Sequence, residues 1–236
     1  MSRIDDLNRL YGILDDLGAR LGGYRYLKRC DARSGWPQRG VYFFFEHGER
    51  RQHRRDLRLV RVGTHAVSTH SRTTMWKRLS QHKGSVRGTH PGGGNHRGSI
   101  FRLHVGTALL NSRAYPEQIR RSWGQGSSAD RHTLHAEYPL ERDVSELIRN
   151  MPFLWVGVPD PVGPESHRKV IEANAVALLS NRGKPRLDPP SPEWLGLCAG
   201  HPAIRESGLW NVDHVDGEYD PGFLHILARY VRQMEP

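Results

Sequence analysis

The sequence contains very little cysteine and no long apolar run. Among its 236 residues the cysteines are Cys30 and Cys198, which are too few for a disulfide framework or a four-cysteine zinc site. No stretch is long enough to span a bilayer, and the first residues lack the basic start and apolar run of a signal peptide. We therefore expect a protein without a membrane anchor, in a reducing compartment such as the cytoplasm.

Acidic residues are also in short supply. The chain has 35 Lys and Arg against 25 Asp and Glu, giving a formal net charge of +10 and a sequence pI of about 10.0. This balance is typical of proteins that bind polyanions, although basic charge can also serve solubility alone. Because arginines cluster within residues 50–55, beside the segments considered below, nucleic acid is the expected partner.

The opening segment carries a leucine stripe. Its leucines alternate at spacings of three and four residues: Leu7, Leu10, Leu14, Leu17 and Leu21. This pattern predicts an amphipathic helix that ends near Gly22-Gly23. The stripe either docks on the chain's own core or pairs with a second subunit in a homodimer, for which it is short.

An antiparallel hairpin and a helix follow. Residues 40–46 are dense in aromatic and β-branched side chains, and 57–63 alternate in polarity, with a charged turn between them. Residues 73–83 favour a helix that Thr73 or Thr74 can cap.

The middle of the chain is expected to be an insertion at about 84–150. It has a stretch rich in Gly, His and Arg at 84–98, in which 91–94 are expected to be a mobile loop, then a predicted strand at 99–105 and an irregular stretch at 111–131. Beyond it, a strand at 154–158, a helix at 166–181 and a final amphipathic helix are predicted.

These elements predict an α+β fold, with a small mixed or antiparallel sheet flanked by helices. We expect a lead-in at 1–37, a catalytic domain at 38–190 that includes the insertion, and a strap and helix at 191–236 packed on the same domain.

Four separated segments give the functional signal. They are Gly40-Val41-Tyr42, Arg61-Val62-Gly63-Thr64, Met75-Trp76-Lys77-Arg78-Leu79 and Glu172-Ala173-Asn174. Each is worthless alone, but in this order and spacing the chain resembles the GIY-YIG endonuclease family over residues 38–83 and 150–190. The resemblance implies a small mixed domain that cuts phosphodiester bonds with a tyrosine, an arginine and one metal ion held by a glutamate.

The resemblance also implies a role for three residues. Tyr42 would lie beside the attacking water as proton acceptor or relay, which requires a nearby metal or arginine because a free tyrosine titrates at about pH 10. Arg78 would bind the scissile phosphate, unless it is merely a solvated helix arginine. Glu172 would hold Mg²⁺ or Mn²⁺, unless it makes a salt bridge at the helix edge.

The chain departs from the family at several positions. Arg61 stands where the second motif usually has a tyrosine; it can bind phosphate but cannot act as a phenol. Thr64 takes a place where many members have a basic residue. The neighbouring His65 is therefore expected to supply the missing proton donor or phosphate contact. The family's last asparagine matches Asp188.

DNA contacts are expected on and beyond the predicted helix. The candidate residues are Lys77, His82, Asn95, His96, Arg97 and Arg102, together with Arg120 and Arg121. The segment 210–214 either faces substrate or anchors the last helix. The 14 histidines have no recognised paired-ligand spacing for zinc.

The sequence thus predicts a metal-dependent endonuclease that acts on DNA. The first alternative is a non-catalytic nucleic-acid-binding protein on a degenerate scaffold, which the altered second motif favours. A basic structural protein of a nucleoprotein assembly is the second; it predicts salt-sensitive binding without metal dependence.

Overall fold

The computed structural model describes residues 2–52, 54–163 and 165–234. Within them, a four-stranded sheet has the order β1-β4-β2-β3, and each neighbouring pair is antiparallel. The strands are β1 (Arg25–Tyr26), β2 (Gly40–Arg50), β3 (Leu57–Gly63) and β4 (Pro152–Gly157). The predicted α+β class is confirmed.

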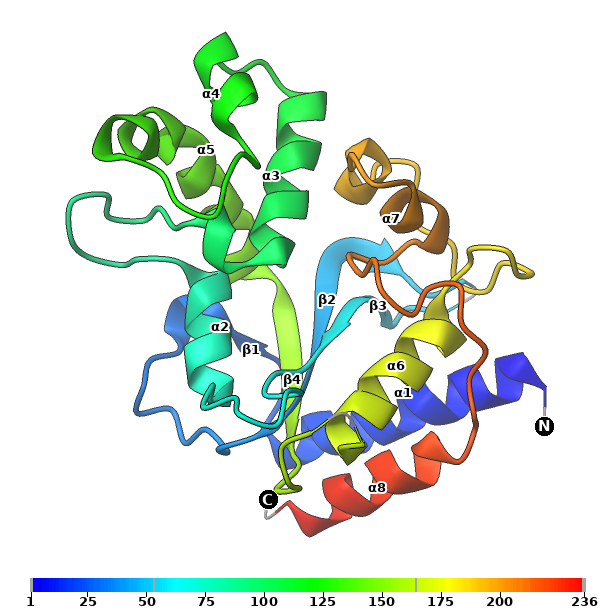
Figure 1. The fold of residues 1–236 in the computed structure, drawn as a ribbon. Coiled ribbons are helices and arrows are strands. Elements are labelled where there is room, and N and C mark those ends of the chain that lie inside the picture. Colours follow the sequence, from blue (N-terminus) through cyan, green and yellow to red (C-terminus); the bar gives the residue numbers. More distant parts are fainter. Residues whose placement is uncertain (1, 53, 164, 235–236) are drawn as a thin grey trace.

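Helices cover the sheet on both sides. The α-helices are α1 (Arg3–Arg20), α2 (Met75–Lys83), α3 (Ile100–Ser112), α4 (Glu117–Ser122), α5 (Arg131–Asn150), α6 (His167–Leu179), α7 (Pro202–Ser207) and α8 (Phe223–Gln233), and the 3₁₀ helices are η1 (Leu27–Arg29), η2 (His96–Gly98) and η3 (Leu195–Cys198). Figure 1 shows α1, α6 and α8 on one side of the sheet, and α2 with α3, α4 and α5 on the other. In the described part of the chain, no helix is long and apolar enough to cross a membrane.

The β2–β3 hairpin forms the centre of the fold, as predicted. Tyr42 pairs with Gly63 on β3 and with Trp155 on β4, so β2 has a neighbour on each side. The aromatic run 42–45 is almost completely buried, which explains why it is dense in large apolar residues.

The leucine stripe of α1 lies inside the protein. Leu7, Leu10, Leu14 and Leu17 are each at most 2% exposed, and α1 contacts α6, α8 and β4. The stripe therefore docks on the chain's own core, and these leucines are not available for the alternative pairing with a second subunit.

The predicted strand at 99–105 is wrong, because these residues begin helix α3. Ser99 caps this helix by accepting a hydrogen bond from the Arg102 backbone N–H at 3.3 Å. Phe101, Val105 and Leu109, spaced four apart, are fully buried along one side of it. The apolar run could not distinguish a short buried strand from a buried helix.

The stretch predicted to be irregular, 111–131, contains α4 as well. It is followed by the 20-residue helix α5, which the sequence patterns did not predict. Helix α5 contacts α2, α3 and α4, so much of residues 84–150 is a helical layer rather than a set of loops.

Candidate active site

The four signal segments meet at one edge of the hairpin, next to α2 and α6. Two glycines make the close packing there possible. A Cβ atom at Gly63 would lie 2.4–2.5 Å from atoms of the Tyr42 ring, and a Cβ atom at Gly40 would lie 2.1 Å from the Val156 carbonyl oxygen. Both positions therefore require glycine, and the Tyr42 side chain packs directly against Gly63 as a result.

A cavity of about 250 Å³ opens where these segments converge. It is lined by Tyr42, Arg61, Thr64, Val67, Arg78, Ile100, His104, Glu172, Trp210, Asn211, Val212, Asp213 and His214. The structure thus brings together four of the five residues predicted to be catalytic, from β2, β3, α2 and α6.

Tyr42 is fully buried, and its hydroxyl is hydrogen-bonded to the side chain of His82. The distance from Tyr42 Oη to His82 Nε2 is 3.0 Å. His82 is also fully buried, and burial, followed by the charges of Arg78, Arg61 and Arg102, places its pKa well below the usual 6.5. His82 is therefore neutral. Its predicted position among the DNA contacts is wrong, because it lies behind Tyr42 and has no exposed surface.

Arg61 is 94% buried, and its position is fixed by the protein. One guanidinium nitrogen donates to the Trp210 carbonyl at 2.6 Å, and the guanidinium carbon lies 4.6 Å from the centre of the Phe101 ring. Its Nε atom is buried without a partner among the described residues. Burial lowers the pKa of Arg61, and the nearby Tyr42 and Glu172 oppose that shift.

Arg78 is partly exposed and lines the cavity from α2. Its Nη1 atom makes long contacts to the side-chain oxygen of Gln81 at 3.2 Å and to the Gly98 carbonyl at 3.5 Å. Both acceptors are uncharged, and the salt bridges of the described residues do not include Arg78. Its charge is therefore available to an anion in the cavity.

Glu172 reaches the cavity from α6. Its Oε1 atom accepts a hydrogen bond from the Thr64 backbone N–H at 3.2 Å. Burial raises the pKa of Glu172; Arg61, the Thr64 bond and Arg78 oppose this, and Asp213 adds to it. Across the described residues Glu172 makes no salt bridge, so the salt-bridge interpretation is wrong for this part of the chain.

The donor set fits a hard divalent cation held loosely. In the described ranges, no group of three or more His, Cys, Asp or Glu side chains is placed to hold a metal. One buried carboxylate without a counter-ion can still bind such a cation when water and substrate oxygens complete the shell. The residues around Glu172 meet that requirement, and the cavity lining includes no cysteine thiolate of the kind that zinc prefers.

His65 lies beside the cavity without lining it. Its Nε2 atom is 3.3 Å from the Gln38 carbonyl oxygen, and its Nδ1 atom is buried without a partner among the described residues. Burial is the main cause that lowers the pKa of His65 to about 4; the bond to Gln38 opposes this shift, and the charge of Arg168 adds to it.

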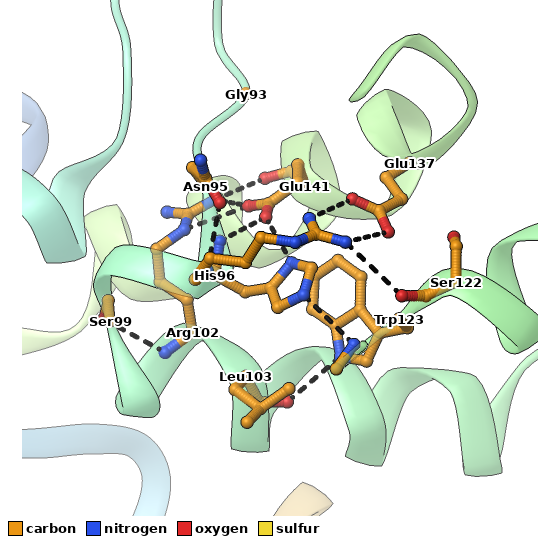
Figure 2. A network of polar contacts seen from close by, with 12 residues as sticks. Gly93, Asn95, His96, Ser99, Arg102, Leu103, Ser122, Trp123, Glu137 and Glu141 are labelled. Atoms are coloured by element: carbon orange, nitrogen blue, oxygen red, sulfur yellow. Dashed lines mark hydrogen bonds and ion pairs between the residues drawn. The ribbon is translucent and has the colours of Figure 1, made fainter. Parts of the chain in front are cut away.

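Three of the predicted DNA contacts form a buried charge network instead, shown in Figure 2. Arg102 is fully buried and pairs with Glu141, whose other oxygen contacts His96 Nδ1 at 3.0 Å. Arg97 pairs with Glu137 through two bonds of 2.6 and 2.9 Å. His96, Arg97 and Arg102 thus hold α3, η2 and α5 together, and the prediction that they face DNA from a surface loop is wrong.

The remaining predicted residues fall in different places. Lys77 on α2 and Asn95 before η2 are exposed. Asp188 does not reach the cavity; it is buried in an ion pair with Arg51 at 2.8 Å. The family match proposed for Asp188 is therefore wrong in position.

Sequence reasoning missed His104, and it considered Asp213 and His214 only as part of a segment that either faces substrate or anchors the last helix. That segment, 210–214, runs along the free edge of β3. Asn211 binds both the N–H and the carbonyl of Val62, at 3.1 and 2.9 Å, and Trp210 N–H donates to the Val60 carbonyl at 2.7 Å. The mixture of aromatic and polar residues in this segment was the available signal, and the bonds to β3 explain how it closes the cavity.

A family model described as the GIY-YIG domain matches residues 1–236. The match extends the resemblance from the four segments to the whole chain, including residues 84–150 and the terminal helices. Comparison with curated proteins and with solved structures found no match.

Proposed function

The chain belongs to the GIY-YIG family, a family of nucleases, and from this premise we propose that it is a metal-dependent endonuclease that hydrolyses phosphodiester bonds in DNA. The observation that carries the proposal is the convergence of Tyr42, Arg78 and Glu172 on one cavity. The net charge of +10 supports a polyanionic substrate.

Arg78 and Arg61 are proposed to bind the scissile phosphate. Arg78 has no charged partner of its own among the described residues, and a guanidinium can contact two phosphate oxygens at once. Arg61 contributes a second positive charge from the floor of the cavity, where it is held by Trp210. Together they offset the charge that builds on the oxygens as water attacks.

Glu172 is proposed to hold the metal ion, Mg²⁺ or Mn²⁺. When bound, such an ion polarises the phosphate and helps to neutralise the leaving oxygen. The buried carboxylate and its single backbone bond to Thr64 support this assignment.

Tyr42 is proposed to take the proton from the attacking water. The water oxygen bonds to phosphorus, its proton passes to the Tyr42 oxygen, and the bond from phosphorus to the leaving oxygen breaks. This role requires the phenolate, which the Arg61 charge in the same cavity would favour. Lys77, Asn95, Arg120 and Arg121 remain the proposed contacts to flanking DNA, and His65 supports the site from outside the cavity wall.

The cytoplasm is the proposed location, because both cysteines are free thiols and a reducing compartment suits them. The domain boundaries at 38–190, with an insertion at about 84–150, are likewise proposed. A homodimer is not part of the proposal, since α1 buries its leucine stripe in its own chain.

The test is cleavage of supercoiled plasmid in magnesium at low salt, with and without a chelator. We expect nicked or linear product in magnesium and none with chelator, with ends that a ligase can rejoin. The competing function, DNA binding without catalysis, is favoured by Arg61 in the second motif. If the protein binds plasmid, single-stranded and branched DNA but cleaves none of them, the non-catalytic function is correct.

A further inference from the structure

A buried chain of hydrogen bonds continues behind Tyr42 into the helical layer. Tyr42 Oη lies 3.0 Å from His82 Nε2, and His82 Nδ1 lies 2.7 Å from Ser99 Oγ. Tyr42 and His82 are 0% exposed and Ser99 is 1% exposed, so water does not reach this chain from its inner end. Each group must therefore find its partner within the protein.

Ser99 caps α3, and this role limits how its hydroxyl can bond to His82. As the N-cap of α3, its oxygen accepts the Arg102 backbone N–H at 3.3 Å. The hydroxyl has a single hydrogen to donate, and in the described part of the chain its side-chain partner is His82 Nδ1.

This arrangement selects one form of the imidazole. If Nδ1 carried a proton, the Ser99 hydrogen would be left buried without an acceptor, which costs free energy. The Tyr42 hydroxyl differs, because Tyr42 lines the cavity and its hydrogen can find an acceptor there. If both nitrogens carried protons, the resulting charge would face Arg61, Arg78 and Arg102 in a buried site. The remaining form has Nδ1 bare and a proton on Nε2.

We propose that Ser99 is a positioning residue that holds His82 as the Nε2–H tautomer, so that His82 donates its hydrogen bond to the Tyr42 oxygen. The function of this bond rests on the proposed nuclease activity. A donor behind the phenol supports negative charge on its oxygen and leaves that oxygen free to accept a proton from the cavity side. In the opposite tautomer, the Tyr42 hydroxyl would instead donate its hydrogen bond to His82 Nε2.

Contacts around His82 and Ser99 keep the chain in place. Arg102 Nη1 donates to the His82 carbonyl at 2.9 Å, and Arg102 itself is fixed by Glu141. Figure 2 shows Arg102 bonded to Glu141, with Ser99 beside it. The Ser99 hydroxyl thereby connects the helical layer, through His82, to the proposed catalytic Tyr42.

The first test reads the tautomer directly and needs no substrate. The nitrogen NMR shifts of ¹⁵N-histidine-labelled protein distinguish a protonated from a bare ring nitrogen, and the His82 signals are those that disappear in His82→Gln. We expect a protonated Nε2 and a bare Nδ1. A proton on Nδ1 of His82 in the unaltered protein would overturn the proposal.

The second test uses Ser99→Asp, which keeps an N-cap acceptor for α3 but cannot donate to His82. We expect the proton to appear on Nδ1 and plasmid cleavage to slow by about a hundredfold. The matched control is Asp130→Ala, which removes the cap of α5; cleavage should stay within about twofold of the unaltered protein. Unchanged cleavage by Ser99→Asp despite a moved proton would overturn the positioning role.

The two proposals fail in different ways. If the unaltered protein cleaves no DNA, the proposed function is wrong, and the NMR result alone then decides the tautomer assignment. If the protein cleaves DNA but carries the proton on Nδ1, the nuclease assignment stands and the role of Ser99 falls.

Discussion

Tyr42 and Gly63 show, at the scale of single residues, how a chemical group is placed by a residue without a side chain. The phenol ring covers Gly63 so closely that a Cβ atom would lie 2.4–2.5 Å from it. Sequence reasoning found both residues as parts of a motif, but it could not show that one makes room for the other. That relation depends on the register of β2 against β3, which pairs Tyr42 with Gly63.

We predict that Gly63→Ala displaces the Tyr42 ring and lowers stability by about 1–3 kcal/mol, the usual cost of overpacking a tight interior. Denaturant unfolding measures this. Gly12→Ala is the matched control, because no atom lies within 4 Å of its added Cβ and helix propensity alone should stabilise α1 by about 0.5–1 kcal/mol. Equal stability of the two variants would contradict the packing argument.

Tyr42→Phe removes the proposed proton acceptor and keeps the ring. We predict that cleavage under single-turnover conditions slows by about a hundredfold or more, whereas the unfolding free energy falls by only about 1 kcal/mol for the lost bond to His82. Tyr115→Phe, which loses a 2.6 Å bond to Asp143 outside the cavity, should cleave normally. A Tyr42→Phe variant with full activity would remove Tyr42 from the mechanism.

At the scale of elements, the hairpin and α6 could be predicted from sequence, whereas α3 could not. Period-two alternation predicted the second strand of the hairpin, and the apolar face beside Glu172 predicted α6; both signals are local, and the structure contains both elements. For α3, the deciding facts are non-local: the charge of the buried Arg102 is balanced by Glu141, which lies 39 residues later. A basic residue in an apolar run therefore suggested a surface, and three side chains of this network were misassigned to DNA.

The Arg102–Glu141 pair should be essential to the helical layer. Glu141→Ala leaves the fully buried Arg102 without its counter-charge, so we predict a loss of about 3–5 kcal/mol. Glu117→Ala breaks the exposed pair with Arg121 and should cost at most about 1 kcal/mol. Thermal or chemical unfolding compares them, and a small loss in Glu141→Ala would show that Arg102 finds another partner.

At the scale of the whole molecule, the chain should be less stable in mild acid. The folded state holds the pKa of His65 at about 4, below the usual 6.5, mainly through burial. Between these values the unfolded chain binds more protons than the folded one, so stability falls as pH falls through this window. We predict a lower melting temperature at about pH 5 than at pH 7, and a smaller drop in His65→Asn. An equal drop in both would assign the acid sensitivity to other groups.

The fold and the site were predictable to different extents at this scale too. Charge balance and four short motifs sufficed for the family, and the match across residues 1–236 agrees. For the segment 210–214, sequence reasoning could not choose between facing the substrate and anchoring the last helix, because Asn211 joins this segment to β3 from 149 residues away. No local pattern encodes such a contact.

The most direct measurement of the central claim compares cleavage and DNA binding by Glu172→Gln with those of the unaltered protein in the same magnesium buffer. The amide keeps the size of the side chain and removes the charge that would hold the metal ion. We predict that binding stays within about threefold while cleavage falls by about a hundredfold or more. Cleavage that survives in Glu172→Gln would contradict the assignment of this cavity as the active site.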